Sequence, residues 1–164
     1  MSQQEQRAYP FSQAMEYEKN LVKGLHLGIR KLSQEAQKTV FREQCLACYT
    51  AIMGGVVRTC SCDPATLDVD GFIKAYEPIE KAATAGSAKI TRKGNIITYE
   101  QKSGFCPCPL IKSEVIDPYP NLCLCTQEVE KRLFEFAHKG SVKVDILESY
   151  MKGGDRCLIR IELL

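Results

Sequence analysis

The most chemically versatile residues of this sequence are its nine cysteines, and all but Cys157 occur in close pairs. Two Cys-x-Cys pairs, Cys106 with Cys108 and Cys123 with Cys125, fall within the stretch GFCPCPLIKSEVIDPYPNLCLC. Thiolates are soft metal ligands, and four held close together would repel one another unless a cation compensated their charge. We therefore expect these four residues to hold one metal centre, Zn²⁺ or alternatively a 4Fe-4S cluster.

The sequence around the two pairs supports this expectation and leaves alternatives open. Pro107 and Pro109 restrict the backbone beside the first pair. Cys125 directly precedes a helix expected to begin at Thr126, and the positive end of a helix dipole favours a thiolate. The spacing is close to that of two-pair zinc sites, although those more often use Cys-x-x-Cys. The thiols could instead be buried as small apolar side chains, or one pair could be a redox dithiol.

The amino-terminal cysteines form a second candidate metal site. Cys45 and Cys48 share one face of an expected helix, where packing and metal binding are equally good explanations. Cys60 and Cys62 lie in an expected loop, where thiols have less reason to pack. These four could form a separate site or complete the first one. Cys157 alternates with apolar residues of the last expected strand, so we expect it to be structural.

Composition limits the classes of function. The chain has 164 residues and 45% hydrophobic content, which indicates a single domain over 1–164. A formal net charge of +2 gives no general reason to bind nucleic acid or an anionic membrane. The longest stretch without charged residues, Gln44 to Val57, is too short for a membrane span. The first residues lack the features of a signal peptide, so we expect a cytoplasmic protein with reduced thiols.

Hydrophobic periodicity predicts an α+β fold in which amino-terminal helices are followed by hairpins of strands. Residues 1–85 are expected to be mainly helical, and residues 86–164 form a cysteine-rich part of strands, a helix and a hairpin. The second helix is expected to begin near Ser33 and to stop at Gly54-Gly55. Asp70 is expected to cap a third helix that Pro78 ends or kinks.

In the second half, the expected elements alternate with turns. Hairpins are predicted over residues 88–101 and 142–163, with a loop from Ile116 to Asn121 and a helix from Thr126 to Gly140. The longer loop from Ser113 to Asn121 has few hydrophobic residues and cannot pack by itself, so we expect a metal to hold it in place. His26 and His138 lie near expected helix ends, where solvent or dipole contacts are the expected roles.

Two stretches resemble known proteins. SVKVDILESYMKGGDRCLIRIELL resembles the end of 4-vinyl-reductase-type small-molecule-binding domains, which have a fold like that of heme-NO-binding proteins. CPCPL and CLCTQEVEKRLFE are similar to cysteine-rich, largely uncharacterised bacterial and archaeal proteins, some described as L-2-amino-thiazoline-4-carboxylate hydrolase-like. Their pattern Cys-Ser-x-Gly-Trp-x-Lys-x-x-Phe-Glu is matched at Cys125, Lys131, Phe134 and Glu135.

The departures from that pattern concern its ligand. Thr126 replaces serine, Glu128 replaces glycine and Val129 replaces the aromatic residue, so a pocket that uses this aromatic side chain would take a different ligand here. The resemblance implies an α+β domain in which the amino-terminal helices pack on an antiparallel sheet built of hairpins. It also implies a metal bound by cysteines near a small-molecule cavity, and often a homodimer. It leads us to expect a metal-binding domain that binds or senses a small molecule. A hydrolase of the L-2-amino-thiazoline-4-carboxylate type and a thiol redox protein are the alternatives.

Overall fold

The structure is a computed structural model that describes residues 11–164, with side chains from Met15 onward. Residues 1–10, on which part of the signal-peptide expectation rests, lie outside the described residues. Two hairpins build the sheet: β1 (Lys89–Lys93) with β2 (Ile96–Gln101), and β3 (Val142–Glu148) with β4 (Cys157–Leu163). They join by antiparallel pairing of β2 with β4, which gives the strand order β1-β2-β4-β3. Both hairpins expected from the sequence are confirmed.

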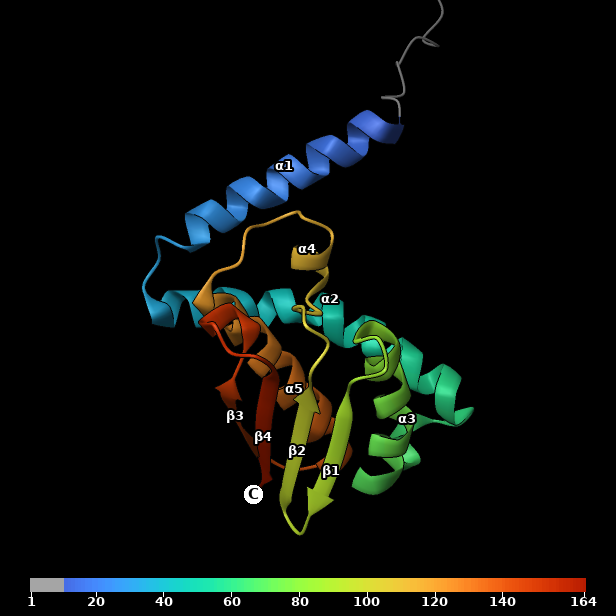
Figure 1. Ribbon diagram of the computed structural model, residues 1–164. Helices are drawn as coiled ribbons and strands as arrows, with labels where there is room; N and C mark the ends of the chain where they lie inside the picture. The colour runs from blue at the N-terminus through green and yellow to red at the C-terminus, as the bar shows by residue number, and fades with distance from the viewer. Residues whose placement is uncertain (1–10) are drawn as a thin grey trace, which may run out of the picture.

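Helices cover one face of this sheet (Figure 1). α3 (Val69–Ala83) and α5 (Cys123–His138) contact the strands, and α2 (Gln34–Cys60) packs across both of these helices. α1 (Phe11–Ile29) lies apart from the sheet, beyond the segment that contains the short helix α4 (Pro109–Lys112). The α+β class is therefore confirmed, with the difference that α5, from the carboxyl-terminal half, supplies much of the helical layer.

The main core lies between the sheet and these helices. Phe72, Tyr76 and Phe134 are fully buried and stack edge to face or tilted against one another, with ring centroids 5.8–6.3 Å apart. Ile97 and Ile161 are opposite each other in β2 and β4 and are also fully buried. Strand alternation produced this apolar face, because every second side chain points to the same side of a sheet.

Three helix boundaries differ from the expected ones. α2 begins after the Ser33 cap as predicted, but it continues through Gly54-Gly55 to Cys60, because Gly55 packs closely against Ile79 of α3. Asp68, rather than Asp70, caps α3 by accepting a hydrogen bond from the Gly71 amide. Pro78 lies inside α3 and does not end it. α5 begins at Cys123 rather than Thr126 and ends at Lys139, whose φ is 56°.

The segment before α5 packs better than its sequence suggests. Ile116, Tyr119 and Leu122 are buried against Phe41 of α2 and form a second apolar cluster. Leu122 ends a short 3₁₀ helix, Pro120–Leu122, that leads directly into α5. The premise that this loop cannot pack by itself was therefore wrong, because its few apolar residues pack against α1 and α2. That a metal also holds the loop in place stays a prediction.

Candidate functional site

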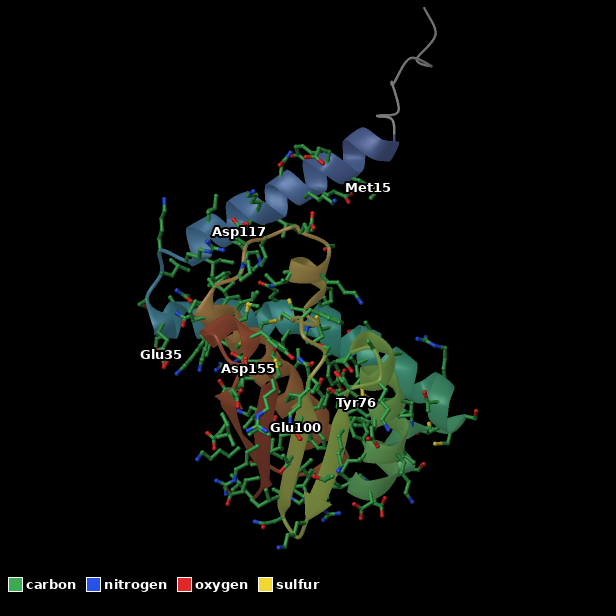
Figure 2. The ribbon with its side chains drawn as sticks, in the orientation of Figure 1. Met15, Glu35, Tyr76, Glu100, Asp117 and Asp155 are labelled. Atoms are coloured by element: carbon green, nitrogen blue, oxygen red, sulfur yellow. The ribbon has the colours of Figure 1, made fainter. Side chains whose placement is uncertain are left out.

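The structure brings most of the paired cysteines into one region, at the end of the sheet where α2 and α5 meet. Cys45 and Cys48 come from the middle of α2, and Cys123 and Cys125 from the first turn of α5. Cys106 and Cys108 lie between β2 and α4, and Cys108 is the residue that immediately precedes α4. Figure 2 shows sulfur atoms gathered along the middle of α2. We call these six residues and Cys157 the cysteine cluster.

Burial and mutual repulsion favour the protonated form of most of these thiols. Burial first, and then nearby Cys108, Cys157 and Cys123, raise the pKa of Cys106 to about 12. The pKa of Cys125 is raised by burial and then by Cys48, Cys108, Cys45 and Cys123. These electrostatic effects show that the thiols share one interior region, in which a cation would reverse the direction of each shift.

Cys157 belongs to this region, although its distance in the sequence suggested otherwise. It is the first residue of β4 and pairs with Gln101, the last residue of β2, just before the segment that carries Cys106. Its side chain is half-buried and raises the pKa values of Cys106 and Cys123. The alternation along β4 correctly predicted that this side chain lies on the inner face of the sheet. Only the pairing of β2 with β4 shows that it lies near the other thiols.

Cys60 and Cys62 are separate from the cluster. Cys60 is the last residue of α2, and a helix rises ~1.5 Å per residue, so it lies on the order of 18 Å along the axis from Cys48. The structure therefore does not bring together the four residues of the second candidate site. Cys60 and Cys62 instead contact each other: the Cys60 thiol donates to the Cys62 carbonyl at 3.2 Å, and the Cys62 amide donates to Cys60 Sγ at 3.3 Å.

The residue types of the cluster suit a thiophilic metal, but the present spacing of the side chains does not. Thiolates from a loop and a helix terminus are the ligands that zinc and iron–sulfur clusters use. Across residues 11–164, however, no three His, Cys, Asp or Glu side chains are grouped so that they could hold an ion. Binding would therefore need the thiols to come closer together than they are in this structure. Of the cluster, Cys45 is the least suited, because it is fully buried and its thiol donates to the Arg42 carbonyl.

Cys123 has the most polar surroundings of the cluster. Burial is the main cause that raises its pKa, whereas Ser149 and Lys152 act in the opposite direction. Ser149 is buried, and its hydroxyl has no hydrogen-bond partner of normal geometry in the described part of the chain. Cys123 also lines a cavity. It is the thiol of the cluster that small molecules can reach most directly.

A network of two carboxyl groups and two phenols adjoins the cysteines. Tyr76 donates to Glu130 and Tyr99 donates to Glu80, each at 2.8 Å. Burial and the neighbouring Glu80 raise the pKa of Glu130 to about 8. Tyr76 is labelled in Figure 2, where it points from α3 into the interior. Sequence reasoning missed this network, although its acidic members lie on faces whose other residues are apolar.

His26 also lies in a different environment from the one expected. It is buried in the second apolar cluster, with Nδ1 2.9 Å from the Tyr119 hydroxyl and Nε2 3.3 Å from the Gln44 amide nitrogen. Burial, together with Arg30, lowers its pKa. The prediction of a solvated imidazole was wrong, because the segment 113–122 folds over this turn of α1. His26 therefore has a structural role and is far from a metal-ligand arrangement.

With this geometry established, the family of the chain can be stated. Residues 72–164 match the model of a family of unknown function (DUF6144). The chain belongs to this family. The matched residues include the whole sheet, α5 and five cysteines of the cluster: Cys106, Cys108, Cys123, Cys125 and Cys157. The amino-terminal cysteines lie outside the match.

Comparison with solved structures supports the fold alone. The chain is similar to trafficking protein particle complex subunit 3 from Naegleria fowleri, whose crystal structure has palmitic acid covalently bound. The TM-score is 0.56 at 12% sequence identity, and the alignment covers 92% of each chain. No curated protein matches the sequence. Within residues 11–164, the helices are too short or too polar to cross a membrane.

Proposed function

We propose that this chain is a cysteine-based metal-binding domain that binds or senses a small molecule. The observation that carries the proposal is the convergence of thiols from α2, α5, the segment before α4 and the start of β4 on one interior region. Six of these thiols, all but Cys157, have pKa values raised by burial. Such thiols provide little packing advantage over alanine or valine, whereas a thiophilic metal would use them directly.

The proposed ligands are Cys106, Cys108, Cys123 and Cys125, and the proposed metal is Zn²⁺ or a 4Fe-4S cluster. Cys48 and Cys157 lie in the same region and are the candidates to replace one of them, because each affects the pKa of a proposed ligand. Four thiolates would close a zinc site and give it a structural role, while three would leave a position for a further ligand. The domain is proposed to be cytoplasmic, where thiols stay reduced.

Binding would be coupled to proton release. Burial holds the pKa of Cys106 and Cys108 above the ordinary range, so a metal must displace their protons. Metal affinity should consequently rise as pH rises over the range in which these thiols are still protonated. A zinc titration at pH 6.5 and at pH 8, in buffers that do not bind zinc, should give tighter binding at the higher value.

The deciding experiment is elemental analysis and an absorption spectrum of anaerobically purified protein. We expect about one zinc per chain in colourless protein, or iron and sulfide in brown protein that air bleaches. Cys108→Ser and Cys123→Ser should each lower occupancy sharply, and Cys62→Ser is the matched control outside the cluster. Fully reduced wild-type protein without stoichiometric metal would contradict the proposal.

A thiol redox protein is the second candidate, favoured by the contact between Cys60 and Cys62. It requires that this pair oxidise to a disulfide and be reduced again without change in metal content. Thiol counting after mild oxidation separates the two candidates. The hydrolase alternative and the 4-vinyl-reductase-like fold remain expectations from the resemblance. The solved neighbour carries palmitic acid, but the cavity beside Cys123 has a mostly polar lining, which does not suit a long acyl chain.

A further inference from the structure

A cavity of about 330 Å³ opens beside the cysteine cluster. Four parts of the chain form its wall: the start of α2, the turn that enters α5, the middle of β3 and the 3₁₀ helix Tyr150–Lys152. Glu35, labelled in Figure 2, lies in the first turn of α2 and shows where this helix begins. A volume of this size lies at the lower end of the range for small-molecule pockets.

The lining combines positive charge with neutral amides. Its polar side chains are Gln34, Lys38, Asn121, Gln127, Asp145 and Lys152. The Asp145 carboxylate is paired with Lys143 at 3.1 Å, which reduces its repulsion of an anion. Lys38 contacts Glu35 at 3.4 Å, but the Glu35 side chain is largely exposed, and such surface pairs are weak. Lys152 has no ion-pair partner within the described part of the chain.

One thiol completes the lining. Cys123 is the single cysteine in the wall of this cavity, so a molecule bound there meets the cluster at Cys123. Amide groups can orient a bound oxyanion through their N–H donors, and the positive charge of the lysine side chains attracts an approaching anion. A neutral apolar molecule would provide no partner for the Lys152 ammonium group.

We propose that this cavity binds a small molecule with a carboxylate or phosphate group, which Lys38 and Lys152 recognise, and that it presents the bound molecule to Cys123. The inference rests on the proposed small-molecule function and names its ligand class. It makes no use of a bound metal. Its test is therefore carried out on metal-free, reduced protein, so that the metal proposal and the cavity proposal can fail separately.

The probe is alkylation by iodoacetate, which is anionic, compared with iodoacetamide, which is neutral and of similar size. In both reactions the thiolate attacks the methylene carbon, a C–S bond forms, the C–I bond breaks and iodide leaves. Peptide mass spectrometry with fragmentation measures the rate at each cysteine. The ratio of the two rates at Cys123 reports the charge preference of the cavity, and exposed Cys62 provides an internal reference.

We expect the iodoacetate-to-iodoacetamide ratio to be roughly fivefold higher at Cys123 than at Cys62, because one nearby charge at contact distance contributes about that factor in water. Lys152→Gln and Lys38→Gln should each lower the ratio at Cys123. Lys89→Gln, an exposed lysine on β1, makes the same change in net charge and should leave the ratio unaltered.

Competition identifies the oxyanion. Inorganic phosphate and acetate, compared with chloride at equal ionic strength, should slow iodoacetamide at Cys123 without slowing it at Cys62, and the stronger competitor names the preferred group. Three results would each overturn the proposal: equal ratios at the two cysteines, a ratio that neither lysine variant lowers, or no reaction at Cys123 with either reagent. Each readout is independent of whether the protein binds zinc.

Discussion

At the residue scale, Glu130 is the most unusual group of the molecule. It is a carboxyl group in the core with one oxygen bonded to the Tyr76 hydroxyl, while the other, Oε2, has no hydrogen-bond partner among the described residues. A buried carboxylate without compensating charge is costly, so the protonated form is favoured. Nearby Glu80 reinforces this effect, because two adjacent carboxylates cannot both ionise easily. Glu130 should therefore be neutral in the folded protein below its pKa of about 8.

This state predicts how stability depends on pH. The native pKa of Glu130 is raised above its unfolded value, so between the two values the native state holds a proton that the unfolded state has lost. Stability should then fall as pH rises from about 4.5 to about 8, by up to ~1.4 kcal/mol per pH unit. Glu130→Gln keeps an acceptor for Tyr76 and should remove most of this slope.

Urea unfolding of reduced protein at several pH values in this window would measure the slope for both proteins. Glu80, Tyr76 and the buried thiols face the same region, and they are unchanged in the variant. An identical dependence on pH in wild type and Glu130→Gln would show that Glu130 is ionised in both states.

At the element scale, the glycines of α2 explain why this helix passes the point where its sequence suggested an end. A Cβ at Gly55 would lie 2.7 Å from Ile79 Cδ1 of α3, whereas one at Gly54 would meet only Arg58, at 3.6 Å. Gly55 is therefore needed for the close approach of α2 and α3. Gly54 has no such packing role and only lowers helix propensity.

These adjacent residues provide a matched pair of variants. Gly54→Ala should raise the free energy of unfolding by up to about 1 kcal/mol, because alanine favours the helix. Gly55→Val should lower it by roughly 1–3 kcal/mol, because the added methyl groups overpack the contact with α3. Denaturant unfolding measures both. A stabilised Gly55→Val protein would mean that α2 and α3 pack less tightly than the structure indicates.

At the scale of the whole molecule, the sequence predicted local structure better than it predicted convergence. Alternation in residues 88–101 and 142–163 identified both hairpins, and helical spacing placed Cys45 and Cys48 on one face. The approach of Cys157 to Cys106 depends on the pairing of β2 with β4, which joins residues far apart in the chain. Spacing alone carries no information on such pairing. For the same reason, the sequence gives no sign that Glu130 is buried, because α3 encloses it only in the folded chain.

The placement of α1 bears on assembly. This helix contacts the segment 113–122 through His26 and Arg30, and Arg30 lies over the Tyr119 ring at 4.4 Å. Its apolar residues Met15, Leu21 and Leu25 are exposed. Most helical stability in proteins comes from packing of an apolar face, so an apolar face that no described residue covers suggests further packing. Figure 1 shows α1 extending beyond the rest of the fold.

A second copy of the chain fits this face by charge. Glu16 and Glu18 lie in the first half of α1, and Lys23, Arg30 and Lys31 lie in or just after its second half. Two such helices packed antiparallel about a twofold axis would place acidic residues opposite basic ones. We therefore predict a homodimer in which α1 pairs with α1 through Leu21 and Leu25.

Sedimentation across a range of protein concentrations tests this prediction. Wild-type protein should be dimeric at high concentration. Leu25→Glu should be monomeric, because it places a negative charge in the apolar contact, opposite the acidic half of α1 in the second copy. Leu147→Glu is the matched control: Leu147, on β3, is 58% exposed, against 59% for Leu25. If the control dissociates the dimer as strongly as Leu25→Glu does, the interface involves the sheet instead. A wild-type protein that stays monomeric at every concentration would contradict the predicted homodimer.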